Sequence, residues 1–263
     1  MSDRRRTFLE QEDWKTIPWE DEPDSKSQLD GVTDIMADIP GLYEDLDILN
    51  SSSTTYRSRD SRLARDILDK CVVNLLKLES WFRVWTIRNP NVVSEVESSS
   101  MAGLTVDEAG YLFPTVLRYS SLGVANELTL YYSIRIQLLS ICRDVDRFRE
   151  SANTSTSAAR EPEISWSPYW RSAWHSTSAS IRLLAIEICR SAEYHILPCH
   201  AQAGTLLFLV PAQVAAKSLG FSSREGKWIT DLLACSAGPS GLSFTKNSVF
   251  ESGGLAVYKD ALG

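Results

Sequence analysis

The longest regular pattern in the chain is an apolar stripe between Ser58 and Arg88. Its members recur every three or four residues over about six helical turns, which places their side chains on one face of an α-helix. Asn89-Pro90 ends the pattern, because proline disfavours a helical backbone in the residue before it. The stripe predicts one long helix with a buried side, and therefore a fold built on helix packing. Its members are Leu63, Ile67, Cys71, Leu75, Leu78, Phe82 and Trp85.

Helical patterns also cover most of the remaining chain, and no segment of useful length alternates apolar and polar residues with period two. A second long stripe follows an expected N-cap at Asn126 and ends at Phe148. The predicted fold class is therefore all-α: a single irregular helical bundle with long antiparallel helices and an extended N-terminal strap. Proline, glycine and capping patterns place further helices. These are expected over 27–39 (ended by Pro40-Gly41), over 42–49, from Pro114, over 181–197 (ended by Pro198), over 201–216, and after a capping box at Ser222-Ser-Arg-Glu225.

Composition divides the chain into three parts. Residues 1–27 are polar and acidic but contain Trp14 and Trp19, and an exposed tail rarely holds two tryptophans. We therefore expect residues 1–27 to form an N-terminal strap across the helical body. Residues 28–237 are the predicted all-helical domain. Residues 238–263, rich in glycine and serine, are the predicted irregular C-terminal tail.

Charge and cysteine content limit the classes of function. The 27 Lys and Arg against 34 Asp and Glu give a net charge of -7. This disfavours non-specific nucleic-acid binding, which depends on cations that neutralise phosphates. The five cysteines are scattered without a C-x-x-C pair, which indicates reduced thiols in an intracellular protein. No apolar run approaches the ~20 residues that span a bilayer, and no secretory signal is recognised. We expect a soluble nuclear or cytoplasmic protein without a membrane partner.

The second half of the chain carries a resemblance to a known family. The C-terminal helical region of fungal binuclear zinc-cluster transcription factors is similar to this chain over Glu187-Ile-Cys-Arg-Ser-Ala-Glu-Tyr-His195, Gly204, Leu207-Phe-Leu-Val-Pro211 and Ala215. Looser matches, in the family's order, are Ile17-Pro-Trp19, Ile39-Pro-Gly-Leu42 and Trp228-Ile-x-x-Leu-Leu233. The full-length regulators bind DNA through a zinc-binding cysteine cluster, and this chain has no such cysteine spacing.

Two hypotheses about function follow. The resemblance implies a fungal transcription-factor-like helical domain without its DNA-binding module. Such a domain would bind a small apolar effector or a protein partner in a regulatory role, without direct DNA binding, and a homodimer is left open. The alternative is a cofactor-free enzyme of fungal secondary metabolism, of cyclase or isomerase type, acting on a polyketide or terpenoid from a biosynthetic gene cluster. Enzymes of this kind need a shaped cavity and one or two positioned polar groups, so they leave no regular motif.

An aromatic cluster is the first candidate site. Trp166, Trp170 and Trp174 recur at a spacing of four, with Tyr169 and His175 beside them. Core packing explains such a cluster. The alternative is the aromatic wall of a pocket for a flat apolar molecule, with Trp170 and Trp174 as ligand contacts and His175 as a polar group or base.

A polar side of the predicted helix at 181–197 is the second candidate site. Glu187, Arg190, Glu193 and Tyr194 lie at spacings that permit neighbouring contacts. Glu187 and Arg190 would form a structural ion pair, or bind a polar ligand group together with Tyr194. In the enzyme hypothesis, Glu187 and His195 join His175 as the catalytic residues.

A zinc site is the third candidate, because His195, Cys199 and His200 are ligand types that zinc prefers. Pro198 separates the two histidines, and none of the specific zinc spacings is present. We therefore expect no metal and no other cofactor, with Cys199 packed at a helix junction and the histidines at helix ends.

Overall fold

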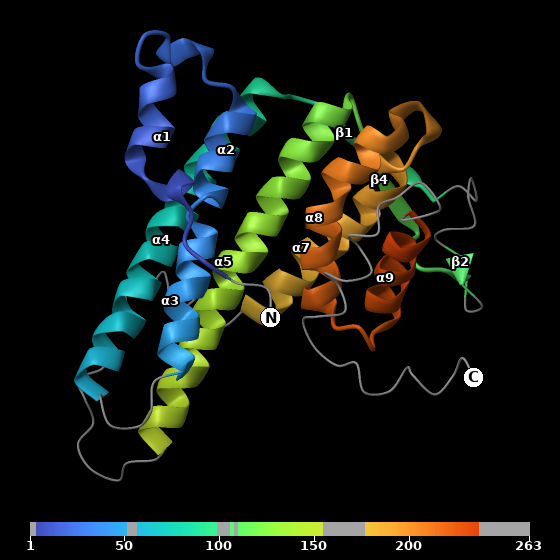
Figure 1. Ribbon diagram of the computed structural model, residues 1–263. Helices are drawn as coiled ribbons and strands as arrows, with labels where there is room; N and C mark the ends of the chain where they lie inside the picture. The colour runs from blue at the N-terminus through green and yellow to red at the C-terminus, as the bar shows by residue number, and fades with distance from the viewer. Residues whose placement is uncertain (1–3, 52–56, 99–105, 108–109, 155–176, 237–263) are drawn as a thin grey trace. The chain divides into compact units, whose positions relative to one another are not determined.

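The computed structural model describes residues 4–51, 57–98, 106–107, 110–154 and 177–236 (Figure 1). Helices dominate these residues, which confirms the all-α fold class. The α-helices are α1 (Glu12–Thr16), α2 (Gln28–Met36), α3 (Ile39–Ser51), α4 (Arg57–Arg88), α5 (Leu122–Thr154), α7 (Thr177–His195), α8 (Ala201–Leu219) and α9 (Arg224–Ser236). Short 3-10 helices are η1 (Phe8–Glu10), η2 (Ile17–Trp19), η3 (Pro23–Ser25) and η4 (Pro198–His200). No helix among these residues combines the length and the apolarity that a membrane span requires.

The described residues group into two compact units. The first, called the N-terminal unit below, contains residues 4–90 together with 130–154 and 177–184. The second, called the C-terminal unit, contains 91–129 and 185–236 with the gaps given above. Helices α5 and α7 contribute to both units.

The core of the N-terminal unit follows the predicted stripe of α4, with a small rotation. Ile67, Cys71, Leu78 and Trp85 are buried as predicted. Leu63, Leu75 and Phe82 are only half-buried, and Ala64, Leu68 and Trp81 lie on the buried side instead. Helices α2 and α3 pack against α4. On α5, Tyr131 stacks on Phe82 with ring centroids 4.4 Å apart. Four residues of the second stripe, which recur every three or four positions, are fully buried: Ile134, Leu138, Ile141 and Val145.

The N-terminal segment is not the extended strap that the sequence analysis predicts. It winds through η1, α1, η2 and η3 in short helical turns, beside α2 in Figure 1. Ion pairs attach it to the helices: Arg6 with Asp45 at 2.8 Å, and Lys15 with Asp38. Trp14 is exposed, so the expectation that its indole packs on the helical body is wrong. Charged side chains, rather than aromatic ones, make the attachment.

Two prolines lie at the start of elements that differ from the predicted ones. Pro40 lies in the first turn of α3, where its missing N–H is tolerated, so it starts that helix as well as ending the one before. Pro114 precedes a strand and not the predicted helix. Strand β4 (Thr115–Tyr119) pairs antiparallel with β1 (Val93–Glu97), from Val93 opposite Tyr119 to Glu97 opposite Thr115. A two-residue pair, β2 (Val106–Asp107) and β3 (Gly110–Tyr111), lies between them in sequence.

Two predicted helix caps are also shifted. Asn126 lies inside α5 and is buried, whereas Ser121 accepts the backbone N–H of Val124 and caps the helix. At α9, the hydroxyl of Ser223 accepts the backbone N–H of Gly226 at 2.9 Å. The cap is therefore one residue later than the predicted Ser222 box.

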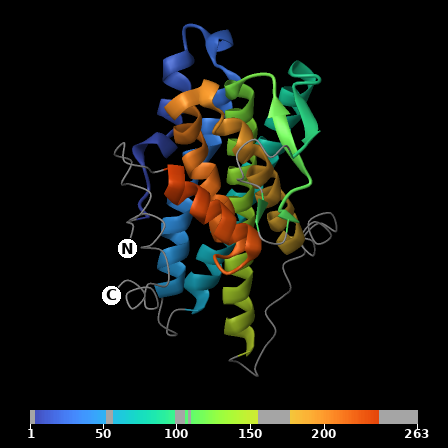
Figure 2. The same ribbon diagram turned by 90° about the vertical axis from the view of Figure 1, so that its right-hand side faces the viewer.

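The C-terminal unit is built on α8, which packs against α9 in both views (Figures 1 and 2). The predicted break at Pro198 is confirmed, since η4 separates α7 from α8. Gly204 contacts the backbone carbonyl of His195, and a Cβ at this position would collide with that carbonyl. The absence of a side chain at Gly204 thus allows α8 to approach the end of α7.

Candidate functional site

Arg190 joins α7 to both long strands of the C-terminal unit. Its guanidinium forms ion pairs with Glu187 at 2.7 Å and with Glu95 of β1 at 2.9 Å. It also donates to Thr115 of β4, to the carbonyl at 3.1 Å and to the hydroxyl at 2.8 Å. The predicted structural ion pair between Glu187 and Arg190 is therefore confirmed. The sequence pattern does not predict the strand partners, because it favours a helix from Pro114 and a connection without regular structure around Glu95.

A second set of polar contacts continues along β4. Arg118 and Glu193 form an ion pair at 2.7 Å, and Glu193 is buried. The Tyr119 hydroxyl lies 2.5 Å from the hydroxyl of Ser191. The rings of Tyr119 and Tyr194 meet edge to face, with centroids 5.2 Å apart. These contacts use the polar side of α7 to fix the helix on the sheet, which leaves few of its groups available to a ligand.

His195 points away from that sheet contact. Its side chain is 0% exposed and stacks on Phe208 of α8, with ring centroids 4.8 Å apart. Burial lowers the pKa of His195 to about 4, although nearby backbone groups of Gly204 and Ala125 oppose this change. Neither ring nitrogen makes a hydrogen bond of normal geometry to a described residue. His195 is thus neutral at pH 7 and enclosed, which fits packing between α7 and α8 better than proton transfer to a substrate.

The junction after α7 holds the other candidate zinc ligands. His200 lies against Tyr194, with ring centroids 4.7 Å apart. Cys199 is exposed and not packed, contrary to expectation. Across the ranges that the structure describes, no group of three His, Cys, Asp or Glu side chains could share a metal ion.

The remaining candidate residues, Trp170, Trp174 and His175, lie outside the described residues, as do Trp166 and Tyr169. Of the four that are described, Glu187 and Arg190 lie together against the strands. Tyr194 contacts Tyr119 and His200, and His195 is turned toward α8. The candidate catalytic residues Glu187 and His195 therefore do not converge on one point.

The buried thiols and phenols lack the environment of activated nucleophiles. Burial raises the pKa of the Cys189 thiol. A hydrogen bond with Cys71 and, as a smaller cause, burial raise the pKa of the Cys142 thiol. Burial also raises the pKa of Tyr43 to about 12. These groups stay protonated at pH 7, whereas a catalytic thiol needs a lowered pKa.

Three hollows of the described structure lie around α1, a region that the sequence pattern does not predict as a site. Cavities of about 430, 370 and 280 Å³ all include Lys15 in their walls. The second and third also contain Asp38 and Lys77. Charged side chains dominate the walls of the second and third cavities, which does not suit a flat apolar metabolite. The only signal in the sequence was the polar composition of residues 1–27 around two tryptophans.

Comparison of the chain with protein-family models, with curated proteins and with solved structures finds no match in any of the three. The resemblance to fungal zinc-cluster regulators, and the function that it implies, therefore stay predictions.

Proposed function

We propose that this protein is a regulatory helical module that acts by binding another protein and does not read DNA itself. The proposal rests on one surface, the outer face of α8, and on the chemistry of the sites described above. It keeps the regulatory hypothesis of the sequence analysis and chooses a protein partner over a small apolar effector.

Helix α8 carries the proposal because its exposed face has no charge before Lys217 in its last turn. No charged residue occurs between Ala201 and Ala216. Leu206, Leu207 and Val210 nevertheless have relative exposures between 38% and 50%. A solvent-facing helix ordinarily places charged or polar residues on its outer side. Large apolar side chains on successive turns, free of charge, are typical of the centre of a protein interface.

The internal contacts of α7 support a binding role over catalysis. Arg190 and Glu193 engage the strands, Glu187 is paired with Arg190, and His195 is enclosed against α8. Two of the three cavities around α1 are walled mainly by charged residues. A net charge of -7 disfavours contact with a phosphate backbone.

The test compares a tagged wild-type protein with the double variant Leu206→Glu/Val210→Glu. Val84→Glu/Ile87→Glu is the matched control, because both residues are exposed apolar side chains on a different helix, α4. Affinity purification with quantitative mass spectrometry should find a protein that the α8 variant loses and the control retains. Calorimetry with that purified protein should give a Kd raised about tenfold or more by the α8 substitutions.

Equal affinity of the α8 variant and the wild type for every captured protein would remove the proposal. Turnover of a polyketide or terpenoid by the purified protein would replace it with the enzyme hypothesis. Sedimentation of the free protein distinguishes a second copy of the chain from a different partner. Circular dichroism of each variant verifies that the fold is intact.

A further inference from the structure

The two lysines of the N-terminal segment are turned toward acidic residues in and just after α2, whereas Arg4, Arg5 and Arg6 before it are exposed. Lys15 is buried beside Asp38, and Lys26 pairs with Asp34 at 2.5 Å. Lys26 also donates to the carbonyl of Lys15 at 2.7 Å. These contacts neutralise the two lysines of the segment from Thr7 to Lys26 and attach it to α2 and to the turn that follows α2.

The large apolar residues of the same segment face solvent. Phe8, Leu9, Trp14 and Ile17 have relative exposures between 47% and 61%. The rings of Phe8 and Trp14 meet edge to face, with centroids 5.2 Å apart, so they form one cluster. This orientation is opposite to that of an ordinary surface segment, whose apolar side chains face the core. A contiguous apolar cluster on an ordered segment is a feature of interaction sites.

Acidic residues adjoin this cluster in the sequence, and Glu20 borders the same cavity as Ile17. They are exposed, and within the part of the chain that the structure describes none of them forms an ion pair. The surface is therefore apolar at its centre and anionic on the side of residues 12–24, whereas the exposed Arg4 and Arg6 before Phe8 are paired with acidic side chains. It would repel the phosphates of a nucleic acid or of an anionic membrane, and it would attract cationic side chains. The acidic residues are Glu12, Asp13, Glu20, Asp21, Glu22 and Asp24.

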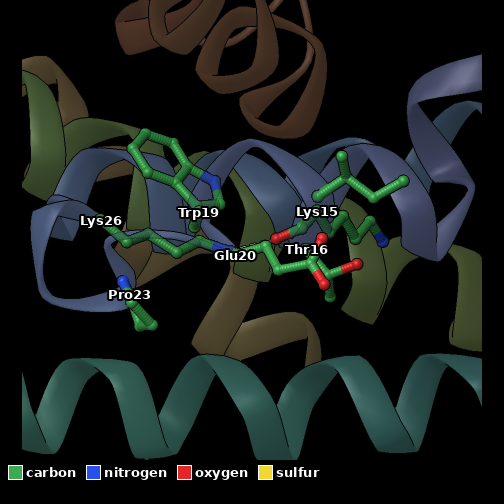
Figure 3. Close-up of a pocket in the computed structure, with 7 residues that line it drawn as sticks. Lys15, Thr16, Trp19, Glu20, Pro23 and Lys26 are labelled. Atoms are coloured by element: carbon green, nitrogen blue, oxygen red, sulfur yellow. Dashed lines mark hydrogen bonds between the residues drawn. The ribbon is translucent and has the colours of Figure 1, made fainter.

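A hollow beside the cluster adds a place for one side chain. The cavity of about 430 Å³ has Ile17, Trp19 and Pro23 as apolar walls, with Glu20 and Lys26 beside them. Figure 3 shows the side chains of Trp19, Glu20, Pro23 and Lys26 around it. The Lys26 ammonium lies 6.0 Å from the Trp19 ring centroid and pairs with Asp34, which leaves the Glu20 carboxylate to meet an incoming cation. A bulky apolar side chain next to a Lys or Arg has the matching chemistry.

We infer that Phe8, Leu9, Trp14 and Ile17, with their acidic edge, form a docking surface for a basic amphipathic helix of a partner protein. This N-terminal docking surface rests on the proposed protein-binding function but uses residues far in sequence from α8. The partner helix places leucine-like side chains on the apolar cluster and in the hollow, and its Lys or Arg residues meet the acidic edge.

The experiment uses the full chain and two synthetic peptides. One is an amphipathic helix of about five turns built from leucine and lysine, and the other replaces each lysine with glutamate. Fluorescence anisotropy should show binding of the lysine peptide alone. Trp14→Ala/Ile17→Ala should weaken that binding about tenfold or more, because it removes the apolar centre. Both residues are exposed, so the fold is retained.

Matched controls separate docking from general attraction to an acidic protein. Val84→Ala/Ile87→Ala removes exposed apolar side chains from α4 and should leave the affinity unchanged. Glu20→Gln/Asp21→Asn should weaken binding, whereas Asp66→Asn/Asp231→Asn, at exposed acids elsewhere, should do so much less. The inference fails if the lysine peptide binds Trp14→Ala/Ile17→Ala as tightly as the wild type, or if the glutamate peptide binds equally well.

The two proposals fail separately. The α8 variant Leu206→Glu/Val210→Glu should bind the lysine peptide with wild-type affinity, because α8 is not part of the docking surface. If peptide binding depends on Trp14 but no partner protein depends on α8, this inference is supported and α8 is not the basis of the proposed function. If a partner protein depends on α8 but peptide binding is the same with and without Trp14, the proposed function is supported and this inference is wrong.

Discussion

A single buried histidine makes the C-terminal unit sensitive to acid. His195 is enclosed by α7 and α8, and its ring stacks on Phe208. Burial lowers its pKa to about 4, below the ordinary value of 6.5. The unfolded chain therefore takes up a proton at this residue before the folded protein does, and protonation favours unfolding.

The pH dependence has a defined sign and range. The contribution of neutral His195 is complete above about pH 6.5 and is lost as the pH falls from there toward about 4. The total loss is about 3 kcal/mol, from a pKa difference of about 2.5. His195→Phe keeps an aromatic ring against Phe208 and removes the titration. Denaturant unfolding of both proteins between pH 7 and pH 4 measures the effect, and parallel curves for the two would contradict the prediction.

Helix α4 has a buried leucine and an exposed leucine within one turn of each other. Leu78 is fully buried, whereas Leu76 is 53% exposed. Both belong to the same helix and are equally good helix formers, so the substitutions differ in the burial that they remove.

Leu78→Ala should lower the free energy of unfolding by about 2–5 kcal/mol, through lost burial and the cavity left behind. Leu76→Ala should change it by about 0.5 kcal/mol or less, as for an ordinary surface position. Chemical denaturation of the two variants tests this. Similar losses would mean that the outer face of α4 is buried in an assembly in solution.

Strand β4 is the element whose type depends most on its neighbours. Thr115-Val-Leu-Arg-Tyr119 is rich in β-branched and aromatic residues, but both Val116 and Leu117 are buried, so it lacks a clean alternation. Its partner β1 lies about twenty residues earlier, and side chains of α7 bind it at Thr115, Arg118 and Tyr119. These contacts make the segment a strand. They involve residues far away in the sequence, so the local sequence pattern does not predict them.

At the scale of the whole molecule, ion pairs position the N-terminal segment, whose large apolar side chains are exposed. The chain has 34 acidic and 27 basic residues, and several of the basic ones bind the N-terminal segment to the helices. Lys15 is the most buried of them. The segment should therefore detach when that one charge is removed, while the helices beneath it stay folded.

Lys15→Met tests this attachment, because it keeps much of the side-chain volume and leaves Asp38 without its ion pair. Hydrogen exchange should become about tenfold faster across residues 8–19, which corresponds to about 1.4 kcal/mol, and stay unchanged in α4. Lys77→Met is the control, since Lys77 borders two of the same cavities but has no ion pair with a described residue. Equal exchange in Lys15→Met and the wild type would show that other contacts hold the segment.

The sequence by itself determined the helical class, the long helices α4 and α5, most of the residues on their buried sides, and the break at Pro198. These features follow from a spacing of three to four residues and from the backbone of proline, so they are local. Only the tertiary structure decided that Thr115–Tyr119 is a strand, that Arg190 binds it, that His195 is enclosed by α8, and that Phe8 and Trp14 face outward. Each depends on strand pairing, burial or charge pairing between residues far apart in the chain. A periodicity carries no information about such partners, because it records only which face of an element is apolar.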